Sequence, residues 1–161
     1  MKVPVTLTVN AVAYPLELEP GTSLLVAVRE AVGLTGAKEG CDDSECGACM
    51  MLLDGKPVNS CSYLALQAEG SDITTVEGLA LDDELHPLQR AFLVHGGVQC
   101  GFCTPGMLIS ATALLTSNPS PTEDEVRIGL SGNLCRCTGY DGIVKAVLSV
   151  AGPAARPEGD G

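Results

Sequence analysis

Residues 40–49 read GCDDSECGAC and carry three of the eight cysteines of the chain. A fourth cysteine, Cys61, follows twelve residues after the last of them. The stretch is too rich in glycine and small polar residues for regular structure, yet it holds three thiols close together. It therefore predicts a loop wrapped around a metal centre, in which Gly40, Gly47 and Ala48 leave room between the metal-binding side chains.

The cysteines of this first set have the spacing of a plant-type [2Fe–2S] ferredoxin loop: Cys41, Cys46, Cys49 and Cys61. Iron in such clusters takes soft, anionic thiolate sulfur, and four thiolates complete one cluster. Backbone N–H groups in a glycine-rich loop can point at the sulfurs and stabilise added negative charge, which raises the reduction potential. The spacing therefore predicts an electron-transfer centre.

The remaining cysteines form a second set with a different spacing: Cys100, Cys103, Cys135 and Cys137. The first pair is expected at the start of a helix that begins at Thr104, and the second pair just before a helix that begins at Asp141. Two helix N-termini would then face one anionic cluster, which is electrostatically favourable. Two clusters in one small chain predict an electron relay.

Structural zinc is the alternative metal, because Cys-x2-Cys pairs are common halves of zinc sites. The tight Cys135-Arg136-Cys137 spacing disfavours it. His86 and His95 could replace cysteines as in a Rieske centre, but eight thiolates already complete two sets. Both histidines are therefore expected at exposed helix positions.

Charge and composition exclude several classes of protein. The 161 residues include 20 acidic and 9 basic side chains, for a formal charge of -11. A surface this negative repels phosphate backbones, so no nucleic-acid partner is expected. The N-terminus has no secretion signal and no stretch approaches about eighteen apolar residues, so we expect a cytoplasmic protein without a membrane span. In a reducing cytosol, metal explains eight thiols better than disulfides do.

Hydrophobic alternation predicts a β-hairpin over residues 3–18, a second hairpin over 50–61 and a short strand at 73–76. A helix is expected from Leu24 to a stop at Gly33. Two hairpins, one helix and a closing strand predict a β-grasp ferredoxin domain. Met50 and Met51 are expected to fill the strand, since thioethers compete poorly with thiolates for iron.

Helical patterns take over near Gly78 and predict four helices, at 85–95, 104–117, 122–130 and 141–150. Thr122 and Glu125 form a capping box for the third, and Asp141 can cap the fourth. We therefore predict an α+β chain with three parts. A β-grasp plant-type [2Fe–2S] ferredoxin domain spans 1–77, a four-helix-bundle [2Fe–2S] domain spans 78–151, and a flexible tail spans 152–161.

Three motifs resemble the iron–sulfur subunit of molybdenum hydroxylases, the family of xanthine dehydrogenase and carbon monoxide dehydrogenase. They lie at residues 40–49, 99–106 and 132–140, and the resemblance extends from about residue 3 to residue 150. It implies a small subunit with two [2Fe–2S] clusters, assembled with a medium FAD subunit and a large subunit that carries a molybdenum–pterin cofactor. Such complexes are often dimers of heterotrimers.

In that family electrons leave reduced molybdenum, pass the cluster of the second cysteine set, then that of the first, and reach FAD. By this analogy Gln99 and the Cys137 sulfur contact the pterin, although a glutamine before a metal loop can also simply satisfy backbone groups. No catalytic acid, base or nucleophile is expected in this chain. The complex is an oxidoreductase whose active site lies on a partner subunit.

A free two-cluster carrier of the ferredoxin type is the alternative function, although a lone carrier has no need of a helical domain that docks a cofactor subunit. The large subunit selects the substrate in this family, which leaves xanthine, an aldehyde, carbon monoxide, an N-heterocycle and an aromatic thioester open. The sequence also leaves open the direction of electron flow, the final acceptor, the oligomeric state and whether the acceptor subunit carries FAD.

Overall fold

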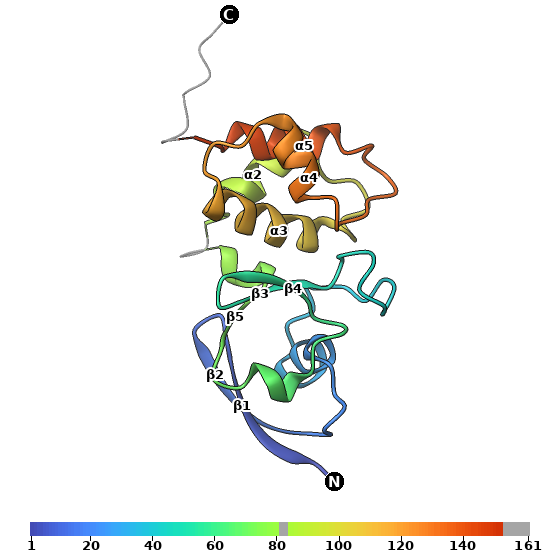
Figure 1. Ribbon diagram of the computed structural model, residues 1–161, viewed down its shortest axis with the longest axis vertical. Helices are drawn as coiled ribbons and strands as arrows, with labels where there is room; N and C mark the ends of the chain where they lie inside the picture. Colours follow the sequence, from blue (N-terminus) through green and yellow to red (C-terminus); the bar gives the residue numbers. More distant parts are fainter. Residues whose placement is uncertain (81–83, 153–161) are drawn as a thin grey trace, which may run out of the picture.

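The computed structural model describes residues 1–80 and 84–152, which form a sheet half and a helical half stacked on each other (Figure 1). The sheet half holds a five-stranded sheet in the order β2-β1-β5-β3-β4. Its strands are β1 (Val3–Val9), β2 (Val12–Leu18), β3 (Met50–Leu53), β4 (Lys56–Asn59) and β5 (Asp72–Thr74). The prediction of a mixed chain that is strand-rich first and helical second is confirmed.

Strands β1 and β2 form the first predicted hairpin and pair antiparallel along their whole length. Asn10 and Ala11 make its turn with φ angles of 50° and 64°. Two successive residues in the left-handed region match the twist of the flanking strands. Val5, Leu7 and Val9 are buried, as the alternation predicts, so one face of β1 lies against the core.

Strand β5 lies in the middle of the sheet, parallel to β1 and antiparallel to β3. It ends earlier than the predicted strand at 73–76. Asn10 explains the early end, because its Oδ1 accepts a hydrogen bond from the Thr75 backbone N–H at 3.0 Å. The chain then turns into the short 3-10 helix η3 (Val76–Leu79).

One helical segment packs against the sheet, formed by α1 (Leu24–Val26) and the wider turns of η1 (Ala27–Val32). The Ser23 hydroxyl accepts a hydrogen bond from the Val26 N–H at 3.3 Å and caps the start. Gly33 ends the segment with a φ of 89°. The predicted helix and its stop are confirmed. A second short 3-10 helix, η2 (Ala65–Ala68), follows β4.

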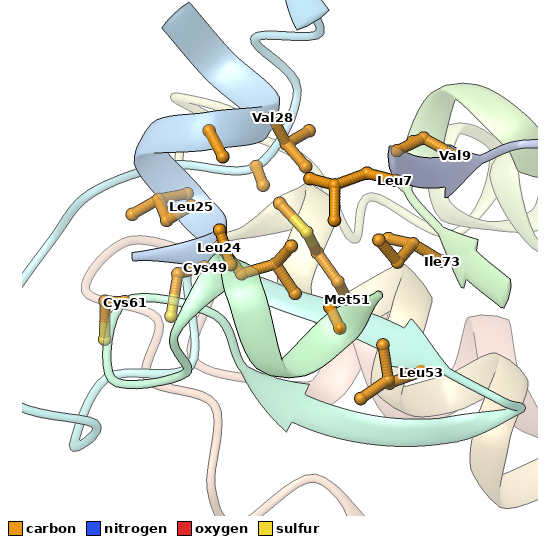
Figure 2. Close-up of a cluster of buried hydrophobic side chains, with 14 of the residues drawn as sticks. Leu7, Val9, Leu24, Leu25, Val28, Cys49, Met51, Leu53, Cys61 and Ile73 are labelled. Atoms are coloured by element: carbon orange, nitrogen blue, oxygen red, sulfur yellow. The ribbon is translucent and has the colours of Figure 1, made fainter. Parts of the chain in front are cut away.

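Strand β3 has a core on each of its faces. Met51 is fully buried with Leu7 and Ile73 beneath the α1–η1 segment (Figure 2). Met50 and Leu52 alternate to the opposite face and pack with the core of the helical half. The two methionines therefore fill the strand, and the two halves of the protein share β3 as a common wall.

The helical half contains α2 (Pro87–Val94), α3 (Thr104–Ser117), α4 (Glu123–Gly129) and α5 (Asp141–Ser149). Helix α3 lies next to the sheet half, and the other three lie beyond it (Figure 1). Each helix begins and ends within two residues of its predicted range. Among the helices of residues 1–80 and 84–152, none has both the length and the apolar character that a membrane span needs.

The capping residue predicted for α4 is confirmed, and the one predicted for α5 is wrong. Thr122 and Glu125 form the predicted capping box of α4. Asp141 does not cap α5, because Tyr140 is the cap residue, with a left-handed φ of 72°. The Asp141 carboxylate instead lies 3.2 Å from the Arg127 guanidinium. Gly152, the first residue of the predicted tail, donates its N–H to Pro119, and residues 153–161 lie outside the described residues.

Candidate metal centres

Three cysteines of the first set lie on the loop between η1 and β3, and the fourth, Cys61, lies just after β4. Polar side chains fix the backbone of the loop. Arg29 donates from Nη1 to the carbonyl oxygens of Thr35 and Ala37 at 2.8 and 2.6 Å. The Asn59 amide donates to the Ser44 carbonyl at 3.0 Å. This loop is irregular but anchored at several points, as a rigid metal loop requires.

Backbone and side-chain groups face two of the cysteine sulfurs of the first set. The Cys46 N–H donates to Cys41 Sγ at 3.3 Å. The Ser62 hydroxyl lies 3.6 Å from Cys61 Sγ. Figure 2 shows Cys49 and Cys61 side by side at one end of the sheet core. The sulfurs of Cys41 and Cys61 therefore have hydrogen-bonding groups close to them.

Gly40 shows how tightly the backbone approaches the sulfurs. A Cβ atom at this position would lie 2.8 Å from Cys46 Sγ and 3.6 Å from a ring carbon of Phe102. Only glycine leaves the sulfur its space here without a shift of its neighbours. The expectation that small residues make room between the cysteines therefore has a direct geometric basis at Gly40.

The second cysteine set joins two segments of the helical half. Cys103 is the residue immediately before α3, and Cys137 Sγ lies 3.6 Å from Cys100 Sγ across 37 residues of sequence. The thiols of Cys103 and Cys135 lie close enough for each to shift the pKa of the other. The Thr138 N–H donates to Cys135 Sγ at 3.4 Å. The structure thus brings together the two pairs that the sequence separates.

In residues 1–80 and 84–152, no three His, Cys, Asp or Glu side chains are arranged as ligands of a single metal ion. A two-iron cluster distributes its four thiolates over two metals.

The pKa values of the thiols differ within each set. Burial raises the pKa of Cys49 to about 11 and that of Cys103 to about 12. Burial also acts on Cys61, but hydrogen bonds from neighbouring hydroxyl and thiol groups outweigh it and lower the pKa. At Cys135 burial is outweighed by the Thr138 hydroxyl and N–H, which bring the pKa to about 7. A coordinated metal deprotonates such thiols outright, so the raised pKa values of Cys49 and Cys103 are compatible with binding a metal.

Exposure differs among Gln99 and the four cysteines of the second set. Gln99, Cys100 and Cys137 are exposed, whereas Cys103 and Cys135 are half-buried. Their roles as pterin contacts and cluster ligands stay predictions.

The two histidines are not at exposed helix positions, which corrects the expectation. Both are half-buried at the ends of α2. His86 caps the helix, since its Nδ1 accepts a hydrogen bond from the Leu88 N–H at 3.2 Å. Burial lowers the pKa of His86, which favours the neutral imidazole that this capping bond needs. His95 is the C-cap residue that directly follows α2.

Sequence reasoning missed Asn133, which joins the two cysteine loops. Its side chain is only 3% exposed, and its Nδ2 donates to the Gly47 carbonyl at 3.1 Å. The next residue, Leu134, donates its N–H to the Cys46 carbonyl at 2.9 Å. Neither bond has a local sequence signal, because the partners are more than eighty residues apart.

Comparison with known proteins agrees with this arrangement. Residues 7–83 match the family described as 2Fe-2S iron-sulfur cluster binding domain, and residues 75–148 match the [2Fe-2S] binding domain. The fold and the two cysteine sets thus define a protein with two iron–sulfur domains.

Relatives narrow this class to a family. The nicotinate dehydrogenase small FeS subunit of Eubacterium barkeri is 50% identical, over 91% of this chain and 93% of its own length. The nicotine 6-hydroxylase small subunit of Paenarthrobacter nicotinovorans is 48% identical, over 98% and 95%. The crystal structure of quinoline 2-oxidoreductase from Pseudomonas putida 86 superposes with a TM-score of 0.89 at 49% identity and covers 91% of each chain. The chain belongs to the family of iron–sulfur subunits of molybdenum hydroxylase-type oxidoreductases.

Proposed function

We propose that this chain relays electrons between the molybdenum–pterin site of a large subunit and the FAD of a medium subunit. The observation that carries the proposal is the direct contact between the two cysteine loops. The Leu134 N–H, next to Cys135, bonds to the Cys46 carbonyl at 2.9 Å. When bound, a [2Fe–2S] cluster in each set accepts and releases single electrons. The contact between the loops supports transfer from one centre to the other within a single chain.

The cluster ligands follow from the donor sets. Cys41, Cys46, Cys49 and Cys61 hold the first cluster, and Cys100, Cys103, Cys135 and Cys137 hold the second. The sheet half is a plant-type ferredoxin β-grasp domain at 1–77, and the helical half is a four-helix bundle at 78–151. The sheet order and the four helices are consistent with both domain types.

The surface beside the second cysteine set supports the docking of the large subunit. Cys100 and Cys137 are exposed next to Gln99, which would contact the pterin together with the Cys137 sulfur. Phe102 and Leu134 are 47% and 57% exposed in the same loops. Large apolar side chains left uncovered around an exposed centre are typical of an interface with a partner protein. This feature favours a subunit over a free carrier.

The names of two relatives support a role as a subunit of a larger enzyme. Both relatives are small subunits of dehydrogenases or hydroxylases that act on nicotinate or nicotine, according to their names. We further propose that this chain works in the cytoplasm as part of a dimer of heterotrimers, with catalysis on the large subunit. Electrons enter through the second cysteine set and leave through the first toward FAD.

Co-purification tests the proposal directly. The tagged chain, expressed with its neighbouring genes and purified without air, should bring down two larger chains, one containing molybdenum and one containing FAD. Iron analysis should give about four irons per small chain. Purification of a red-brown chain alone, with both clusters and full activity toward a soluble acceptor, would establish the free carrier instead. A colourless chain that contains zinc would refute both functions.

A further inference from the structure

Two successive carbonyl groups of the first cysteine loop point toward the helical half. The Cys46 carbonyl accepts from the Leu134 N–H at 2.9 Å, and the Gly47 carbonyl accepts from Asn133 Nδ2 at 3.1 Å. The Met50 N–H also donates to the Gly47 carbonyl, at 3.2 Å. These bonds fix the orientation of both peptide groups between Cys46 and Ala48.

Fixing a carbonyl also fixes the N–H of the same peptide group. A trans peptide is planar, and its C=O and N–H point in opposite directions. The N–H groups of Gly47 and Ala48 therefore point away from the helical half. The preceding N–H, that of Cys46, donates to Cys41 Sγ at 3.3 Å, so one amide of this loop already faces a cysteine sulfur.

Close neighbours on several sides of Gly47 keep its carbonyl group in this orientation. Gly47 has a φ of 71°, and a Cβ there would lie 2.6 Å from Asn133 Nδ2. On the other side, a Cβ on Gly106 of α3 would lie 2.1 Å from the Gly47 oxygen. The carbonyl thus sits in a close-fitting recess formed by Asn133 and the first turn of α3. Asn133 supplies the one side-chain hydrogen bond to this carbonyl among the described residues.

We infer that Asn133 is a positioning residue that raises the reduction potential of the first cluster, although it belongs to the loop of the second. It holds the Gly47 carbonyl outward and thereby keeps the Ala48 N–H directed at the cluster sulfurs, where it stabilises the added electron. This inference rests on the proposed function, because it takes the first cysteine set as the ligands of a [2Fe–2S] cluster.

The test replaces Asn133 by leucine, which keeps the approximate volume and removes the N–H donor. Asn118→Ala is the matched control, since the Asn118 side chain accepts only a local bond from the Ser120 N–H at 3.3 Å. Both variants and the wild type are purified as the complete complex, or as the full chain if it purifies alone. Dye-mediated redox titration followed by EPR gives a midpoint potential for each cluster.

The inference predicts that Asn133→Leu makes the first cluster about tenfold harder to reduce at a fixed potential, as expected for one lost charge-assisted hydrogen bond. For a one-electron couple, tenfold corresponds to about 59 mV. The second cluster and the Asn118→Ala variant should keep their wild-type potentials. A purely structural role for Asn133 would lower thermal stability and leave the potential of the first cluster unchanged, which would overturn the inference.

A second variant covers the case in which Asn133→Leu does not fold. Gly106→Ala displaces the Gly47 carbonyl from the opposite side and should lower the potential of the same cluster. Unchanged potentials in a folded Gly106→Ala protein would count against the inference. A wild-type protein without two [2Fe–2S] clusters would refute the proposed function itself, whereas intact clusters with an unmoved potential would refute only the role of Asn133.

Discussion

Replacing Gly106 with alanine should destabilise the protein, although alanine is the better helix former. Gly106 lies in the first turn of α3, where alanine would gain up to about 1 kcal/mol of helix propensity. The new Cβ would lie 2.1 Å from the backbone oxygen of Gly47, which no flexible side chain can relieve. The helix or the first cysteine loop must therefore move.

The cost of this movement exceeds the gain. The Gly47 oxygen accepts hydrogen bonds from Met50 and Asn133, and weakening each of them costs about 1 kcal/mol. Overpacking at a buried contact costs roughly a further 1 to 3 kcal/mol. After subtraction of the gain in propensity, we expect a loss of about 2 to 4 kcal/mol in the free energy of unfolding. For a chain of this size, that lowers the Tm by about 4 to 16 °C.

Circular dichroism of the iron-loaded protein without air measures this effect, with the far-ultraviolet signal for the backbone and the visible signal for the clusters. Gly129→Ala is the matched control, since it is also a helical glycine, and its Cβ would meet only the movable side chain of Leu114, at 3.0 Å. That variant should keep the wild-type Tm or exceed it slightly. If Gly106→Ala were as stable as Gly129→Ala, the tight contact between α3 and the first cysteine loop would be refuted.

Cys103→Ser should halve the iron content, to about two irons per chain, and abolish one EPR signal; full iron content would contradict its place among the ligands. Gly40→Ala should lower the occupancy of the first centre alone, because its Cβ would lie 2.8 Å from Cys46 Sγ; two equally filled centres would contradict this. Glu125→Gln should make the Tm fall less steeply as the pH becomes acid. The Thr122 backbone N–H lowers the pKa of Glu125, so its stabilising effect is present above the ordinary pKa and lost as pH falls through the lowered value; an unchanged pH profile of Tm would contradict the capping box.

Elements with strong local signals could be predicted from the sequence. The alternation in β1 and the apolar run of α3 each extend over one element, and the capping box at Thr122 needs only residues three positions apart. The close spacing of the cysteines within residues 40–49, 100–103 and 135–137 is equally readable, because it reflects which sulfurs one loop can gather. The approach of Cys137 to Cys100 depends on the fold instead. Local chemistry is sufficient wherever the partners of a residue are its neighbours in sequence.

Features that depend on distant partners could not be predicted. Asp141 has the composition of a helix cap, but Arg127, fourteen residues away, attracts its carboxylate. The early end of β5 depends on Asn10, which lies 65 residues before Thr75. In the sequence Asn133 is an ordinary loop residue, and its role follows only from the fold, which brings the Gly47 carbonyl within hydrogen-bond distance. Tertiary contacts decide these positions, and no propensity or periodicity encodes them.

The sharing of β3 by both cores limits how the protein can be divided. A fragment that ends near residue 77 would leave Met50 and Leu52 without the helices that cover them. The complementary fragment would lose the strand that closes its own interior. Each piece expressed alone should therefore be prone to aggregation. Transplanting either redox centre into another scaffold would first require a redesign of the apolar surface at β3.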